Sequence, residues 1–179
     1  MLIIGSAQDE FIAVKSLKAA RDGWIGFDGV ITIEDANFAD GLRIQSEKTR
    51  QMVFQFDDTD RIGGQAFAPE LAQIRRILEI GRHYRGKRLL VHCFQGQSRS
   101  AGAALAILAD RLGVGREKEA VDQLLQICPL AVCNRVVLQH ADTLLSRNGA
   151  IMSAWQAYEN TNDKAAGVRL LRGLADQAG

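Results

Sequence analysis

The stretch that most constrains the fold runs from Leu89 to Ser100 and reads Leu-Leu-Val-His-Cys-Phe-Gln-Gly-Gln-Ser-Arg-Ser. A short apolar run leads into a His-Cys pair, and five residues separate the cysteine from the arginine. Small residues follow from Ala101 to Ala104, and small side chains let a helix pack closely against a sheet. The pattern predicts a buried strand, a tight loop over residues 92–100 and a helix that continues to about Leu112.

This loop has the properties of an anion cradle. A loop that leads into a helix presents backbone N–H groups without helical partners, and the positive end of the helix dipole lies at the same place. Gly96 supplies backbone freedom for the curl, and the Arg99 guanidinium can hold two phosphate oxygens at once. The predicted phosphate-binding residues are Phe94, Gln95, Gly96, Gln97, Ser98 and Arg99.

Cys93 stands at the base of the predicted cradle. The field that binds a phosphate dianion also stabilises a thiolate, which makes the cysteine a candidate nucleophile. Ser100 is within hydrogen-bonding reach of such a sulfur and is expected to stabilise the thiolate when it departs, and His92 is expected to order the loop. A lone buried cysteine is usually inert packing, but the joint pattern favours a cysteine-dependent phosphatase.

The pattern His92-Cys93-x-x-Gly96-x-x-Arg99-Ser100 resembles the active-site motif of the protein tyrosine phosphatases. The size of the chain and the Ser98-Arg99-Ser100 ending are most similar to the dual-specificity branch, with a resemblance from about Leu2 to residue 147. It implies attack by cysteine on phosphorus, a cysteinyl-phosphate intermediate and hydrolysis by water, with no metal and no cofactor. Gln95 and Gln97 depart from the small or apolar residues common in that branch, which affects the rim more than the chemistry.

A proton donor is expected on a second loop, because cleavage of a phosphate ester needs a proton on the leaving oxygen. The run Met52–Phe56 predicts a strand that ends in Asp57-Asp58-Thr59-Asp60. The resemblance places an acid just after such a strand and favours Asp58, with Asp57 second and Asp60 third. The remaining carboxylates are then solvated loop residues.

Three further residues have competing interpretations. Relatives carry a polar residue that braces the phosphate-binding loop, a role for which Asn134 is the candidate, although a plain helix N-cap is simpler. Cys128 and Cys133 are interpreted as half-buried residues at helix ends, and the alternative is a resolving thiol for an oxidised Cys93.

The rest of the chain predicts an α/β fold, in which a mostly parallel sheet of four to five strands is flanked by helices. A phosphatase domain is predicted over residues 1–160, with residues 161–179 as a tail or helix packed on it. The first expected elements are a strand at Leu2–Ile4 and a helix that is capped by Ser6, includes Phe11 and ends near Arg21. Strands at Trp24–Phe27 and Val30–Ile33 are expected to flank an Asp28-Gly29 turn. A short helix capped by Ser46 and a helix that starts at Pro69 are expected to follow. Later helices are expected at about 116–127, 133–147 and 150–159.

Composition narrows the functional classes. The 179 residues carry a formal net charge of +1 and are 47% hydrophobic, which favours neither nucleic-acid binding nor attachment to a membrane. Three cysteines do not make a disulfide framework, and the N-terminus lacks the basic start of a signal peptide, so a reducing, cytoplasmic setting is expected.

The leading hypothesis is a phosphatase acting on phosphotyrosine, and also on phosphoserine or phosphothreonine, in proteins. The alternatives are a phosphatase for a small phosphomonoester, an inositide or an RNA 5′ end, and a phospho-binding module with weak catalysis. A sulfurtransferase also uses a loop cysteine, but the spacing to Arg99 and Ser100 fits the phosphatases better.

Overall fold

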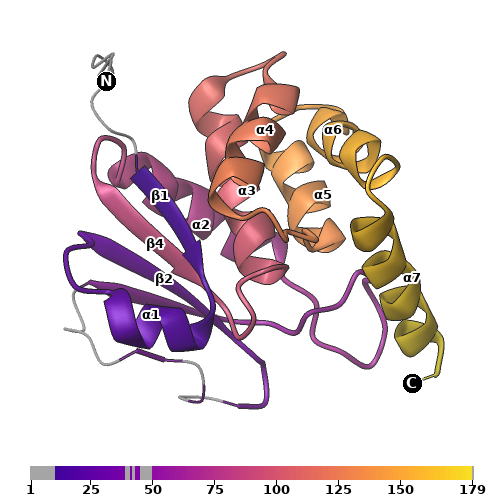
Figure 1. Cartoon of the computed structure of the whole chain (residues 1–179), viewed down its shortest axis with the longest axis horizontal. Helices are drawn as coiled ribbons and strands as arrows, with labels where there is room; N and C mark the ends of the chain where they lie inside the picture. Colours follow the sequence, from indigo (N-terminus) through magenta and orange to yellow (C-terminus); the bar gives the residue numbers. More distant parts are fainter. Residues whose placement is uncertain (1–10, 39–40, 42, 45–49, 179) are drawn as a thin grey trace.

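The computed structural model describes residues 11–38, 41, 43–44 and 50–178. Within that part, parallel strands alternate with helices (Figure 1). In chain order the elements are β1 (Phe11–Lys15), α1 (Leu17–Gly23), β2 (Gly29–Glu34), β3 (Gln51–Gln55), α2 (Leu71–His83), β4 (Arg88–His92), α3 (Arg99–Leu112), α4 (Glu117–Ile127), α5 (Arg135–Leu144), α6 (Ala150–Glu159) and α7 (Asp163–Ala178). No helix of the described part is long and apolar enough to span a membrane.

The four described strands form one parallel sheet in the order β1-β4-β2-β3. Strand β4 lies in its interior, where Leu90 pairs with Ala13 of β1 and Val30 of β2. The apolar run Leu89–Val91 is fully buried, as expected for a strand covered on both faces. Because all four strands run the same way, their carboxyl ends meet at one edge of the sheet, and the loop that follows β4 begins there.

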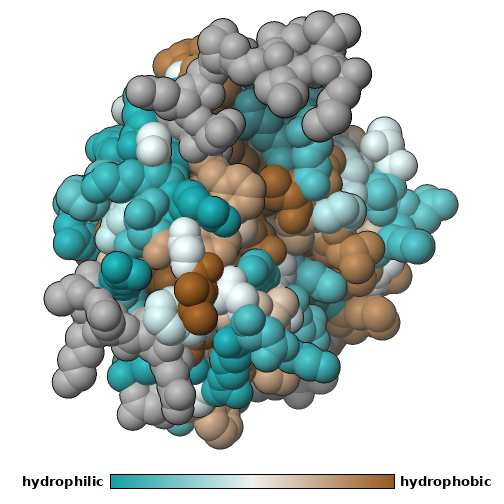
Figure 2. All heavy atoms as spheres, turned by 60° about the vertical axis from the view of Figure 1, so that its left-hand side comes forward, coloured by the Kyte–Doolittle hydropathy of each residue, from teal (hydrophilic) through white to brown (hydrophobic). Residues whose placement is uncertain are grey.

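Two apolar clusters cover the two faces of the sheet. The smaller cluster joins Ala20 of α1 to Phe27, Val30 and Leu90. The larger one packs the other face against α2 and α3, with α4, α5 and α6 stacked outside them (Figure 1). On the side that carries β1 and α1, the surface is largely hydrophilic with separate apolar patches (Figure 2).

Helix α3 is the central helix of the larger cluster, and its small residues explain how it fits there. Every residue from Arg99 to Ala109 is buried. A Cβ added at Gly81 of α2 would lie 2.7 Å from a methyl carbon of Ile107, so α2 and α3 pack closely at this glycine. The predicted strand–loop–helix unit over residues 88–112 is thus confirmed, and so is the α/β class with a parallel sheet.

The prediction for the first described segment was wrong. Residues Phe11–Lys15 form strand β1 rather than part of a helix, and Ser16 caps the helix that follows, through a hydrogen bond from the Ala19 N–H at 3.2 Å. Parallel pairing with β4 outweighs the helical spacing of Phe11, Val14 and Leu17. The strand expected at Leu2–Ile4 and the caps expected at Ser6 and Ser46 lie outside the described residues.

Two other local predictions need correction. Residues 24–28 form a loop rather than a strand, and Gly29 belongs to β2 instead of a turn. The Asp28 carboxylate accepts a hydrogen bond from the Arg88 N–H at 2.8 Å, which ties the loop to the start of β4. The helix expected from Pro69 begins at Leu71, because a capping box between Glu70 and Gln73 sets its start.

Replacing Gly81 with alanine tests the close contact between α2 and α3. Gly81→Ala is expected to lower the free energy of unfolding by about 1–3 kcal/mol, because the added methyl group overlaps Ile107 in a packed core. Urea denaturation measures the change. The matched control is Gly167→Ala in α7, where no atom lies within 4 Å of the added Cβ, and equal losses from both variants would contradict the packing argument.

Candidate active site

The sulfur of Cys93 lies at the base of the predicted phosphate-binding loop, residues 92–100. Its Sγ is 3.2 Å from Ser100 Oγ and accepts a hydrogen bond from the Gly96 N–H at 3.3 Å. The residue is 3% exposed, so a phosphorus atom that reaches the sulfur must enter the loop itself. The Gly96 N–H and the Ser100 hydroxyl are thus both within hydrogen-bonding distance of the sulfur, and the contact with Ser100 is the one expected from the sequence.

Gly96 shapes the loop through a close approach between two backbone segments. Its φ is 73°, and an added Cβ would lie 2.4–2.5 Å from the backbone of Lys15 and Ser16. The Phe94 carbonyl accepts a hydrogen bond from the Leu17 N–H at 3.0 Å, which fixes the loop on the junction of β1 and α1. Glycine is needed both for the backbone conformation and for the lack of space.

The guanidinium of Arg99 is held between two other loops. Its Nη1 donates to the Phe56 carbonyl at 2.9 Å and pairs with Asp35 Oδ1 at 2.6 Å. The residue is 4% exposed, and its Nε–H has no acceptor among the described residues. The side chain is therefore fixed in position and retains a donor for an anion.

Like Arg172, Asp35 is a residue at the site that was not predicted from the sequence. It follows directly after β2, the neighbour of β4 in the sheet. An available signal was an acidic residue at the end of a buried strand, because the carboxyl ends of parallel strands share one edge of the sheet. The sequence does not show which strands are neighbours in the sheet.

Asp58 lies on residues 56–70, here called the acid-bearing loop, and its carboxylate contacts the phosphate-binding loop. Its Oδ1 accepts hydrogen bonds from Ser98 Oγ at 2.6 Å and from Asn134 Nδ2 at 3.1 Å. Its Oδ2 accepts one from Arg172 Nη2 at 2.9 Å. The structure thus brings the favoured acid beside the loop that carries Cys93.

The other two candidate carboxylates, Asp57 and Asp60, accept hydrogen bonds from backbone N–H groups. Asp57 accepts hydrogen bonds from the Ala36 N–H at 3.0 Å and the Phe67 N–H at 2.8 Å. Asp60 accepts one from the Arg135 N–H at 2.9 Å and pairs with Arg169. Both have partners other than the phosphate-binding loop, so their contacts give them an architectural role.

Asn134 has both of the contacts that its two interpretations require. Its Oδ1 caps α5 by accepting from the Val137 N–H at 3.1 Å. Its Nδ2 donates to Asp58 and to the Thr59 carbonyl at 2.9 Å, and its N–H donates to the Ser98 carbonyl at 3.3 Å. One buried amide therefore connects α5, the acid-bearing loop and the phosphate-binding loop.

His92 is fully buried behind the loop. Its Nε2 lies 2.8 Å from Thr32 Oγ1, and that hydroxyl donates its proton to Gln51 Oε1 at 2.9 Å. Its Nδ1 lies 3.5 Å from the Cys93 carbonyl. Burial lowers the pKa of His92 from its ordinary value of 6.5 to about 4, so a neutral ring links β4 to β2.

The remaining residues of the loop form its rim. Phe94 and Gln95 are exposed, whereas Gln97 is half-buried and its carbonyl accepts from the Val132 N–H at 2.8 Å. Gln97 also lines a cavity of about 190 Å³ between residues 129–132 and α7.

The two other cysteines are more buried than the sequence suggested. The Cys128 thiol donates to the Gly96 carbonyl at 3.4 Å, and burial raises its pKa to about 11, with a further contribution from Cys93. Burial raises the pKa of the Cys133 thiol well above its ordinary value. Both are protonated packing thiols at neutral pH.

Comparison with known proteins agrees with this architecture. No family model matches the sequence, and no curated protein is detectably similar to it. Among solved structures, the human tyrosine phosphatase-like serine/threonine/tyrosine-interacting protein is 15% identical, with a TM-score of 0.63 over 80% of this chain and 97% of that one. PTPMT1 in complex with PI(5)P is 19% identical, with a TM-score of 0.56 over 80% and 97%. Human DUSP28 is 14% identical, with a TM-score of 0.56 over 87% and 98%.

At these identities the likenesses show the fold. They confirm the predicted single-domain α/β architecture, a fold that this chain shares with tyrosine-phosphatase-like and dual-specificity-type structures.

The buried imidazole of His92 predicts a loss of stability in acid. Between pH 6.5 and about 4 the unfolded chain binds a proton that the folded chain excludes, so stability is complete above pH 6.5 and falls below it. The free energy of unfolding, measured by urea denaturation, is expected to be about 2 kcal/mol lower at pH 5 than at pH 7 from this group alone. His92→Gln removes that component, and an unchanged pH dependence in the variant would contradict the assignment.

Proposed function

We propose that this chain, which has the fold of the cysteine-dependent protein tyrosine phosphatases, hydrolyses phosphomonoesters through a covalent cysteinyl-phosphate. One observation carries the proposal. The Cys93 sulfur lies at the base of a loop whose backbone curls over it, with Ser100 beside it and a fixed Arg99 at the helix start. Fold alone does not determine function, but this arrangement of groups suits the reaction.

In the first step the Cys93 thiolate attacks phosphorus and the bond from phosphorus to the leaving oxygen breaks. Arg99 and the backbone N–H groups of residues 94–99 hold the three remaining phosphoryl oxygens. Asp58, in its protonated form, gives its proton to the leaving oxygen, so that an alcohol or phenol departs.

In the second step water attacks phosphorus, and the Asp58 carboxylate accepts a proton from it. The bond between sulfur and phosphorus breaks, and inorganic phosphate leaves the loop. Ser100, 3.2 Å from the sulfur, stabilises the returning thiolate. Each atom in this cycle comes from the protein, the substrate or water, and the proposal includes no metal.

We place proteins phosphorylated on tyrosine first among the substrates, with phosphoserine and phosphothreonine next. Phe94 is 57% exposed on the rim, where an aromatic side chain suits an aryl phosphate. A phosphoinositide is the second candidate, since PTPMT1, which shares the fold, has been solved with PI(5)P. The absence of lysine from residues 93–100 argues against a highly phosphorylated inositide.

The proposed phosphatase domain comprises residues 1–160, and residues 161–179 contribute a helix packed on it. We also propose a cytoplasmic location, in which a reducing environment keeps the Cys93 thiol usable. This is consistent with the free state of the three cysteines in the described part of the chain.

A generic aryl phosphate with a metal chelator present tests the chemistry. The wild type is expected to turn over, Cys93→Ser to lose at least about 10³-fold in rate, and Arg99→Lys to lose about 10²-fold, because lysine cannot hold two phosphate oxygens. Release of inorganic phosphate is the measurement, and thermal unfolding checks that both variants fold. Turnover that requires added metal, or that survives Cys93→Ser, would reject the mechanism.

The choice among the carboxylates is tested by the basicity of the leaving group. Asp58→Asn is expected to reduce kcat by about 10²–10⁴-fold on a phosphate ester with a basic leaving group, and much less on one whose leaving group needs no proton. Asp57→Asn is the matched control, and its effect is expected to be the same for both substrates, since Asp57 binds backbone N–H groups. A stronger dependence on the leaving group in Asp57→Asn would transfer the role to Asp57.

A further inference from the structure

Helix α7 reaches the candidate active site from the far end of the chain. It runs beside α6 and past the acid-bearing loop (Figure 1). Arg172, on this helix, donates from Nη2 to Asp58 Oδ2 at 2.9 Å and from Nη1 to Ser98 Oγ at 2.6 Å. A single guanidinium thereby connects the candidate acid to the phosphate-binding loop.

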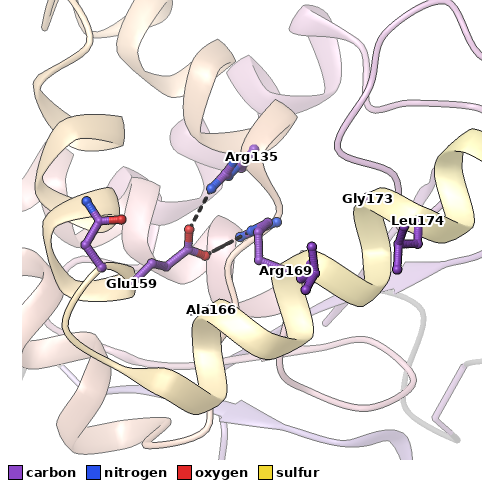
Figure 3. A pocket seen from close by; sticks show the side chains of 8 residues that line it. Arg135, Glu159, Ala166, Arg169, Gly173 and Leu174 are labelled. Atoms are coloured by element: carbon purple, nitrogen blue, oxygen red, sulfur yellow. Dashed lines mark hydrogen bonds and ion pairs between the residues drawn. The ribbon is translucent and has the colours of Figure 1, made fainter.

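Ion pairs attach α7 to the rest of the molecule. Arg169 pairs with Asp60 and Glu159 and donates to the Cys133 carbonyl at 2.7 Å. Glu159 lies between Arg169 and Arg135, and its Oε2 is 2.9 Å from Nη2 of Arg135 (Figure 3). These four charged side chains bring α5, α6, α7 and the acid-bearing loop together.

Apolar packing contributes little to this attachment. Among the described side chains of α7, Ala165 is the buried apolar one, while Leu170, Leu171 and Leu174 are 66%, 67% and 55% exposed. The pocket beneath the helix, of about 370 Å³, separates part of α7 from α5 and α6 (Figure 3). Segments with few buried apolar contacts open at a lower free energy than the core, so α7 is suited to detach.

The contacts of Asp58 oppose its role in the first chemical step. Both of its oxygens accept hydrogen bonds, Oδ1 from Ser98 and Asn134 and Oδ2 from Arg172. These contacts occupy both oxygens and hold the side chain against the phosphate-binding loop. Protonation of the leaving oxygen needs the neutral form, with one oxygen free to point at the substrate.

Arg172 forms an ion pair with Asp58 at 2.9 Å. Ser98 and Asn134, which face Asp58 from the phosphate-binding loop and α5, are neutral. The Arg99 guanidinium pairs with Asp35, and Arg169 pairs with Asp60. On the same loop, Asp57 is engaged by backbone N–H groups.

We propose that Arg172 is an autoinhibitory positioning residue, through which α7 occupies the Asp58 carboxyl group and holds it turned toward Ser98. Detachment of α7 then frees the carboxyl group to carry a proton to the leaving oxygen. This inference rests on the proposed function, because it assigns Asp58 to proton transfer and Cys93 to nucleophilic attack.

The test is the rate of Arg172→Gln on aryl phosphates of increasing leaving-group basicity, measured across pH. We expect kcat/KM to rise roughly two- to fivefold for the most basic leaving groups and to change little for the least basic. A change of this size is typical of the removal of a partly exposed ion pair. A merely structural change would alter all substrates equally.

Two matched variants isolate the contact. Lys164→Gln removes the same charge from an exposed position of α7 and is expected to leave the profile unchanged. Arg172→Lys keeps the charge and is expected to remain close to the wild type. Thermal unfolding of all three verifies that the domain stays folded.

The outcomes separate this inference from the function on which it rests. An active wild type whose Arg172→Gln variant is slower, or equally changed on every substrate, overturns the inhibitory contact and leaves the phosphatase proposal standing. Failure of both the wild type and Arg172→Gln to release phosphate from any ester overturns the phosphatase proposal and the contact with it. Activity that appears only in Arg172→Gln supports both.

Discussion

The candidate site depends on how closely the phosphate-binding loop approaches the junction of β1 and α1. Gly96 lies against the backbone of Lys15 and Ser16 with no space for a Cβ, and the Phe94 carbonyl binds the Leu17 N–H. That contact forces the loop to curl back over the Cys93 sulfur. The short interior strand β4 positions the loop at the carboxyl edge of the sheet, beside the N-terminus of α3, and the N-terminus of a helix favours an anion.

Side chains from four other segments then complete the site around this loop. Asp35 follows β2, Asp58 follows β3, Asn134 caps α5 and Arg172 comes from α7. Each reaches Arg99 or Ser98 through a hydrogen bond or an ion pair, either directly or through Asp58. The candidate site is therefore assembled from segments that lie far apart in the chain.

Prediction from the sequence succeeded where the signal was local. The apolar run Leu89–Val91, the spacing from Cys93 to Arg99 and the small residues of α3 act within one strand–loop–helix unit, so their neighbours in sequence are also their neighbours in space. It failed at Phe11–Lys15, where helical spacing of apolar residues occurs in a strand that pairs with β4. A five-residue segment follows its sheet partner more than its own propensity, and the partner lies far along the chain.

The sequence by itself determined the strand, loop and helix that surround Cys93, because a thiol, a glycine and an arginine at fixed spacing constrain the loop that they share. Only the tertiary structure decided which carboxylate stands beside that loop. It assigned Asp57 and Asp60 to backbone and to α5, brought Asp35 to Arg99, and set Arg172, 114 residues along the chain, against Asp58. Such pairings depend on the order of the strands and on the packing of a terminal helix. Both are determined by the burial of whole elements, so the residues that come into contact share no short-range sequence pattern.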